Sequence, residues 1–169
     1  RADDGSSLSH SVLAQDLNDG ETHRARIWYD GTRLHVAVDG QLEVVQPVDF
    51  ATGIASPDGC AYVGFTAANG GVFARQSIRN WVFGQAGDVV DFAFTNALTL
   101  NGSASINGGE LRLTPDLTGQ AGSAWYTAEK SVITRPWVTT FSFRLDGTAD
   151  GLSFVIQDSG TGALGGGGS

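Results

Sequence analysis

Short stretches in which apolar and polar residues alternate follow one another along the chain, and none of them keeps a helical period. The clearest stretch is 137–145. Its bulky positions share one face: Trp137, Thr139, Phe141, Phe143 and Leu145. Alternation with a period of two is typical of a strand that buries one face in a core. The pattern therefore predicts β-strands, and it predicts a long, half-buried strand over 137–145.

Turn residues separate these stretches at the spacing of about 8–12 residues that is typical of sandwiches and barrels. Asp30-Gly31 and Asp39-Gly40 are the strongest hairpin signals and divide 22–48 into a three-strand meander. Residues 49–59 are expected to form a loop. We expect strands at Thr22–Tyr29, Leu34–Val38, Leu42–Val48, Tyr62–Ala67, Ser77–Phe83, Val89–Phe94, Ala97–Leu100, Leu111–Thr114, Ala121–Tyr126, Trp137–Leu145 and Gly151–Gln157.

The predicted fold is all-β: an antiparallel β-sandwich of two sheets, with no helix longer than about two turns. The chain has 169 residues, enough for one domain with a core or for two partial ones. A net charge of −8 with 10 basic residues argues against a nucleic-acid partner, which needs clustered Lys and Arg. No stretch reaches the ~20 apolar residues of a membrane span, so none is expected.

Several strings together resemble the strands of L-type (legume-lectin-like, concanavalin A-like) lectin domains of bacterial type. They cover nearly the whole chain: LNGSASINGGELRLTPDLTGQAGSAWYTAEKSV, FSFRLDGTADGLSFVIQD, HRARIWYDGTRLHVAVDG, AYVGFTAANGG and IRNWVF. The resemblance implies a concanavalin A-like jelly roll that recognises carbohydrate without catalysis.

The order of these strings is the reverse of the usual one. Residues 1–84 resemble the C-terminal half of such a lectin-like sandwich, and residues 85–169 resemble its N-terminal half. Two explanations stay open: one circularly permuted domain, or a window containing parts of two tandem copies. In a permuted domain, the short connector Gly84–Gly87 would close a hairpin that places Trp81–Phe83 beside Asp91–Phe94.

The family's metal-binding segment has no counterpart here, so the sandwich is predicted to be incomplete. In the family, an acidic strand and an Asp/Asn-rich loop hold Ca²⁺ and a transition metal, because hard cations need clustered oxygen ligands. Asp3-Asp4 is either a remnant of that segment or an ordinary turn. We expect no metal and no cofactor in this chain, and Ca²⁺ only in a complete domain.

The Ala-Asp-Gly turn is the first candidate site that the resemblance implies. In the family, the residue equivalent to Asp150 follows a cis peptide and accepts hydrogen bonds from two sugar hydroxyls, with Gly151 beside it. A carboxylate suits this task because it accepts charge-assisted hydrogen bonds from neighbouring hydroxyls. The alternative is a solvated Asp-Gly hairpin turn.

Two glycine-containing loops complete the candidate carbohydrate site. In the family, a loop equivalent to 165–168 donates backbone N–H groups to the sugar, which implicates Gly167 and Gly168; a Gly-Gly-Gly-Gly-Ser end is also a common engineered linker. Asn69, Gly70 and Gly71 match the specificity loop, or form an ordinary tight turn. We expect all three loops to converge on one concave surface.

The remaining aromatic and acidic residues bear on function. Trp28, Trp81, Trp125 and Trp137 lie among apolar neighbours, which favours core packing over sugar stacking for most of them. The paired carboxylates of sandwich glucanases are missing from the strand sequences, so no enzyme is expected.

We therefore expect a glycan- or polysaccharide-binding module of an extracellular or cell-surface protein, with neighbouring lectin-like repeats as further partners. Adhesion through such a module belongs to the same expectation. The alternatives are a structural or adhesion spacer without sugar binding, and, less favoured, a glucanase-like sandwich.

Overall fold

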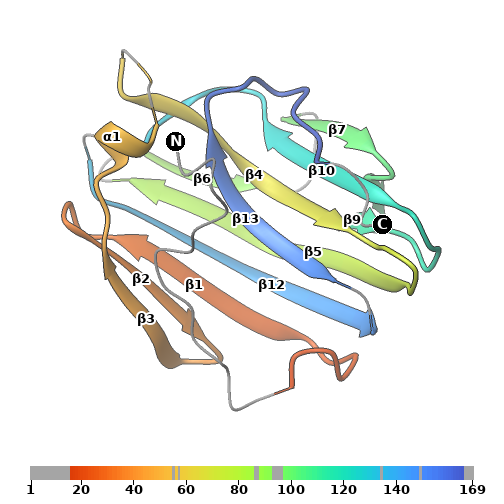
Figure 1. Ribbon diagram of the computed structural model, residues 1–169. Helices are drawn as coiled ribbons and strands as arrows, with labels where there is room; N and C mark the ends of the chain where they lie inside the picture. Colours follow the sequence, from red (N-terminus) through yellow and green to blue (C-terminus); the bar gives the residue numbers. More distant parts are fainter. Residues whose placement is uncertain are drawn as a thin grey trace.

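A computed structural model describes residues 16–165, apart from 55, 57, 86–87, 93–96, 134 and 149; for 88–92 it describes the backbone alone. Within these residues the chain is an all-β sandwich of two antiparallel sheets, as predicted, and its one helix is a single turn. Figure 1 shows the two sheets as stacked layers, with β13 and β4 of the smaller sheet lying over the strands of the larger sheet. No helix in the described part of the chain has the length and apolar character of a membrane span.

The larger sheet runs in the order β3-β2-β1-β12-β5-β9-β8. β6 and β9 pair with the same edge of β5. β9 pairs with its first half, and β6 pairs with its C-terminal half. Its strands are β1 (His23–Tyr29), β2 (Arg33–Val38), β3 (Gln41–Pro47), β5 (Ala74–Gln85), β6 (Asp88–Phe92), β8 (Ser105–Asn107), β9 (Glu110–Thr114) and β12 (Trp137–Gly147).

The smaller sheet is built around β4. β10 and the short β11 pair with one edge of β4, β13 pairs with the other edge, and β7 lies outside β10. The strands are β4 (Cys60–Ala68), β7 (Leu98–Gly102), β10 (Ala121–Tyr126), β11 (Lys130–Ser131) and β13 (Gly151–Gln157).

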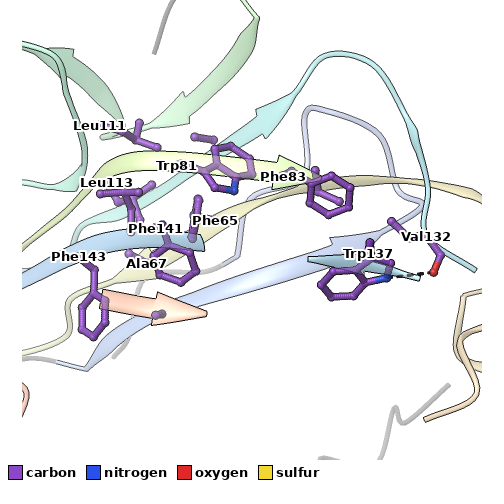
Figure 2. Packing of buried hydrophobic residues seen from close by; sticks show 14 of the residues in the cluster. Phe65, Ala67, Trp81, Phe83, Leu111, Leu113, Val132, Trp137, Phe141 and Phe143 are labelled. Atoms are coloured by element: carbon purple, nitrogen blue, oxygen red, sulfur yellow. Dashed lines mark hydrogen bonds between the residues drawn. The ribbon is translucent and has the colours of Figure 1, made fainter. Parts of the chain in front are cut away.

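Alternating side chains from both sheets fill the space between the layers. Along β12 every second residue from Trp137 to Leu145 is buried, which confirms the face predicted from the sequence. Phe65 of β4 meets the rings of Trp81 and Phe141 edge to face at centroid distances of 4.8 Å, the geometry that aromatic quadrupoles favour. Figure 2 shows this cluster, with Trp137 donating a hydrogen bond to the carbonyl of Val132.

Three of the four tryptophans are buried: Trp81, Trp125 and Trp137. Trp81 and Trp137 pack in the core between the sheets, whereas Trp125 is buried on the outer side of the smaller sheet. Trp28 is the exception. It is partly exposed on the outer face of the larger sheet, where it stacks on His35 with ring centroids 4.7 Å apart.

The predicted hairpin after β5 is confirmed for the described residues, because Trp81 pairs with Phe92 and Val82 with Asp91. The two halves of the chain also share both sheets. β12 lies between β1 and β5, and β4 lies between β10 and β13. The explanations of this order, a permuted domain or a tandem-array window, both stay predictions.

The loop predicted over 49–59 contains a helical turn, α1 (Phe50–Gly53), so that part of the prediction is wrong. Asp49 caps the turn by accepting a hydrogen bond from the Ala51 N–H at 3.0 Å, which satisfies a donor that a helix start leaves free. The sequence also missed β8 and β11, which have three and two residues and are too short for periodicity to detect.

Candidate functional site

A small hollow opens where β4 ends and β13 begins, on the outer face of the smaller sheet. Its volume is about 210 Å³, and it is lined by Thr66, Ala67, Ala68, Asp150, Gly151, Ser153 and Gly165. The register explains the grouping, because Ser153 pairs with Thr66 and Gly151 with Ala68. Since Phe65 and Ala67 point into the core, Thr66 and Ala68 face outward.

Asp150 stands at the rim of this hollow, directly before β13, and its side chain is exposed. The described residues offer its carboxylate no hydrogen bond or ion pair. It is therefore free to accept hydrogen bonds from hydroxyl groups of a ligand. The peptide bond before it includes residue 149, so the cis geometry expected there lies outside the described residues.

Gly165 brings the second loop to the hollow. Residues 158–165 fold back over the smaller sheet and are fixed by three side-chain donors. Trp125 Nε1 and Ser123 Oγ each donate to the Ala163 carbonyl at 2.7 Å, and Asn101 Nδ2 donates to the Thr161 carbonyl at 2.8 Å. Gly167 and Gly168, the predicted donors, lie outside the described residues.

Asn69 turns away from the hollow and is fully buried. Its side-chain nitrogen donates to the carbonyls of Ala74, Pro115 and Leu117 at 2.9–3.1 Å, and its oxygen accepts from Gln76 Nε2 at 3.1 Å. Its N–H donors are committed to backbone carbonyls, and its oxygen is buried beside Gln76, so the side chain offers no donor to a ligand. The side chain of Asn69 therefore holds the loop in place rather than facing the hollow.

The two glycines after Asn69 differ. Gly70 is buried, and its carbonyl accepts from the Gly119 N–H at 3.1 Å, whereas Gly71 is exposed with open space around it. This loop continues into Val72 and Phe73, each 49% exposed. The Thr148 N–H donates to the Phe73 carbonyl at 3.3 Å, which places the loop beside the turn that carries Asp150.

Sequence reasoning missed two hydroxyl groups of the hollow, those of Thr66 and Ser153. Both are small polar residues in alternating strands, and their outward direction follows from the alternation once β4 and β13 are paired. Pairing between segments this far apart in sequence cannot be read from either segment alone.

The donor set of the hollow does not fit a metal ion. Asp150 is the single carboxylate that lines it, and the part of the chain that the structure describes holds no group of three or more His, Cys, Asp or Glu side chains suited to a metal. Ca²⁺ takes six to eight oxygen ligands. The described residues of the hollow do not form such a ligand set.

The chain was compared with known proteins. No protein-family model matches it, and neither does any curated protein. What the structure establishes is the all-β fold, two antiparallel sheets packed as a sandwich.

Proposed function

We propose that this chain is a non-catalytic, lectin-like carbohydrate-binding module of an extracellular or cell-surface protein, and that the hollow beside Asp150 is its sugar site. The observation that carries the proposal is the uncommitted carboxylate of Asp150 beside the hydroxyls of Thr66 and Ser153. Sugars present vicinal hydroxyls, which donate to a carboxylate and exchange hydrogen bonds with hydroxyls. The resemblance to concanavalin A-like lectins points to the same aspartate.

The size of the hollow supports a small ligand. At about 210 Å³ it is below the ~300–1,000 Å³ of pockets that enclose drug-sized molecules. One sugar ring at the end or side of a glycan suits such a space. With so few contacts, we expect a dissociation constant on the order of millimolar for one site.

The acidic groups at the hollow favour binding over hydrolysis. Glycosidases use a pair of carboxyl groups, about 5–5.5 Å apart in retaining enzymes. The lining includes one carboxylate, that of Asp150. A single acid can bind a sugar but cannot supply both the general acid and the nucleophile or base.

The test is a glycan array probed with a multimerised form of the chain, because multivalency makes weak sites detectable. Asp150→Asn removes the charge and keeps the shape, and Glu43→Gln on the larger sheet is the control for charge. We expect Asp150→Asn to abolish binding to neutral glycans and Glu43→Gln to leave it unchanged. Equal binding by wild type and Asp150→Asn would place the site elsewhere, and no binding to any glycan would favour the structural spacer.

A further inference from the structure

Arginines gather on the outer face of the larger sheet, although the chain as a whole carries a net charge of −8. Alternation along β1, β5, β9 and β12 turns their apolar residues inward and these side chains outward. The register then aligns the arginines across the sheet. They are Arg24, Arg26, Arg75, Arg79, Arg112 and Arg144.

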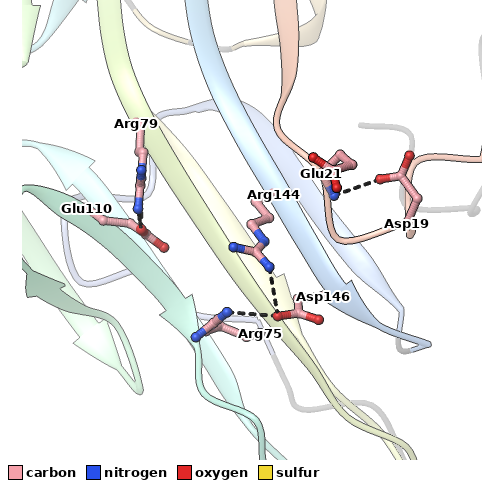
Figure 3. A network of polar contacts seen from close by, with 7 residues as sticks. All are labelled: Asp19, Glu21, Arg75, Arg79, Glu110, Arg144 and Asp146. Atoms are coloured by element: carbon pink, nitrogen blue, oxygen red, sulfur yellow. Dashed lines mark hydrogen bonds and ion pairs between the residues drawn. The ribbon is translucent and has the colours of Figure 1, made fainter.

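Carboxylates pair with three of these arginines: Arg75, Arg79 and Arg144. Asp146 accepts from Arg75 at 2.8 Å and from Arg144 at 3.4 Å, and Glu110 accepts from Arg79 Nε at 2.8 Å. Figure 3 shows both groups. Burial disfavours the charged form of Glu110, but hydrogen bonds from Ser77 and Arg79 outweigh it and lower the pKa of Glu110, so the pair is charged at neutral pH.

Arg24 and Arg26, on β1, differ from these arginines. Within the described residues neither guanidinium forms an ion pair with a carboxylate. Asp39 lies close to these arginines. Its carboxylate oxygens already accept hydrogen bonds from the Arg24 backbone N–H and from His23 Nδ1, both at 2.8 Å. Among the described residues, the guanidinium groups of Arg24 and Arg26 therefore form no ion pair, although the carboxylate of Asp39 lines the same hollow. Arg112 forms no ion pair either, but its Nη2 donates to Ser105 Oγ at 3.2 Å.

These two arginines border a hollow of about 550 Å³. Its other walls are mixed: the indole of Trp28, the apolar side chains of Ala37 and Leu42, Gly40, the hydroxyl of Thr140, and the carboxylate of Asp39. That carboxylate already accepts hydrogen bonds from the Arg24 backbone N–H and from His23 Nδ1. A sugar ring has the matching mixture, with C–H groups on its faces and hydroxyls at its edges. An acidic peptide has no such ring to lay against this wall.

A second hollow, of about 680 Å³, lies next to the first. Arg26 and Trp28 line both hollows and form the ridge between them. Contacts hold the side chains of this ridge in place. The Arg26 guanidinium lies 4.9 Å from the Trp28 ring centroid. His35 stacks on Trp28 and forms a 2.9 Å hydrogen bond with Asp30. A chain of several sugar residues can cross the ridge and occupy both hollows.

We propose that this face binds an anionic polysaccharide, with Arg24 and Arg26 pairing with its carboxylate or sulfate groups and Trp28 and Leu42 contacting its rings. Guanidinium groups bind such oxyanions through paired N–H donors. The site is separate from the hollow beside Asp150, which lies on the outer face of the other sheet, and it does not depend on the function proposed there.

The experiment measures binding of the chain to polygalacturonate, heparin, neutral dextran and polyglutamate, each at low and at physiological salt. The variant is Arg24→Gln with Arg26→Gln. The control is Arg75→Gln with Arg144→Gln, which removes the same charge from the same face at arginines that already have a carboxylate partner. Circular dichroism and thermal unfolding verify that each variant is folded.

We expect the chain to bind polygalacturonate, heparin or both, and this binding to weaken as the salt concentration rises. Preference for polygalacturonate would identify carboxylate, and preference for heparin would identify sulfate, as the group that the arginines bind. Loss of two charge-assisted contacts should weaken binding at least about tenfold in the Arg24/Arg26 variant and much less in the control. Asp150→Asn should bind the anionic polymer like wild type. Equal loss in variant and control, equal binding of polyglutamate, or binding of dextran alone would overturn the proposal.

Discussion

The indole Nε1 of Trp125 donates a 2.7 Å hydrogen bond to the carbonyl of Ala163. Trp125 lies on β10 with its ring on the outer side of the smaller sheet, yet it is 1% exposed. The segment 158–165 covers it and leads to Gly165 at the hollow beside Asp150. Trp125 thus helps to hold, together with Ser123 and Asn101, the segment that covers the smaller sheet and leads to the candidate sugar site.

Trp125→Phe keeps a large ring and removes the donor. We expect a loss of about 1–2 kcal/mol in the free energy of unfolding, since the Ala163 carbonyl loses a buried hydrogen bond. Hydrogen exchange in 158–165 should become faster, and glycan binding at Asp150 weaker. Hydrogen-exchange mass spectrometry checks this, with Trp28→Phe as the control. Unchanged exchange in 158–165 would show that other contacts hold the segment.

Asn69 is predicted to be a structural residue. Asn69→Ala removes the donor to three backbone carbonyls and the acceptor for Gln76. We expect a loss of about 2–3 kcal/mol, because several buried hydrogen bonds are removed together. Urea unfolding measures it. Asn107→Ala is the control, since that amide is exposed and bonds to Ser105 alone. A stable Asn69→Ala protein that has lost only glycan binding would contradict the structural role.

Gly64 allows β4 to pack closely against Trp125. A Cβ at Gly64 would lie 2.2 Å from the Ala124 carbonyl oxygen and 2.6 Å from the Trp125 ring. The backbone of β10 would have to move, so Gly64→Ala should destabilise the fold by about 1–3 kcal/mol. Gly53→Ala, where nothing lies within 4 Å, is the matched control. Thermal unfolding compares the two, and equal midpoints would show that β10 shifts without cost.

His23 should make stability depend on pH. Its ring is buried against Phe143 and lies 2.8 Å from Asp39 and 3.1 Å from Asp19. Burial disfavours the charged ring, but hydrogen bonds to Asp39 and Asp19 outweigh it and raise the pKa of His23. A group with a raised pKa in the folded state stabilises the fold most below its unfolded pKa, about 6.5.

The stabilisation from His23 is therefore complete near pH 5.5 and is lost as the pH rises through the raised pKa of the folded state. We expect His23→Gln to be less stable than wild type by about 1–2 kcal/mol at pH 5.5, and the difference to shrink by pH 9. Urea unfolding at the two pH values measures it. A difference that stays constant with pH would exclude a role for the charged ring.

The sequence alone determined the fold class and most of the strands. In 137–145 every second residue, from Trp137 to Leu145, is buried, because successive side chains of a strand point to opposite faces and one face meets the core. Asp39-Gly40 likewise predicted its turn: both residues have positive φ, which few residue pairs adopt easily. These features depend on neighbours in sequence, so the sequence is sufficient to read them.

Tertiary structure decided what surrounds each candidate site residue. Asn69 and Asp150 were equally polar candidates, yet one is buried under three carbonyls and the other is exposed beside Thr66 and Ser153. The sequence also could not show that Arg24 and Arg26 form no ion pair among the described residues, because ion pairing depends on which carboxylates the register places nearby. Burial and ion pairing arise between segments that are distant in sequence, and only the packed sheets bring those segments together.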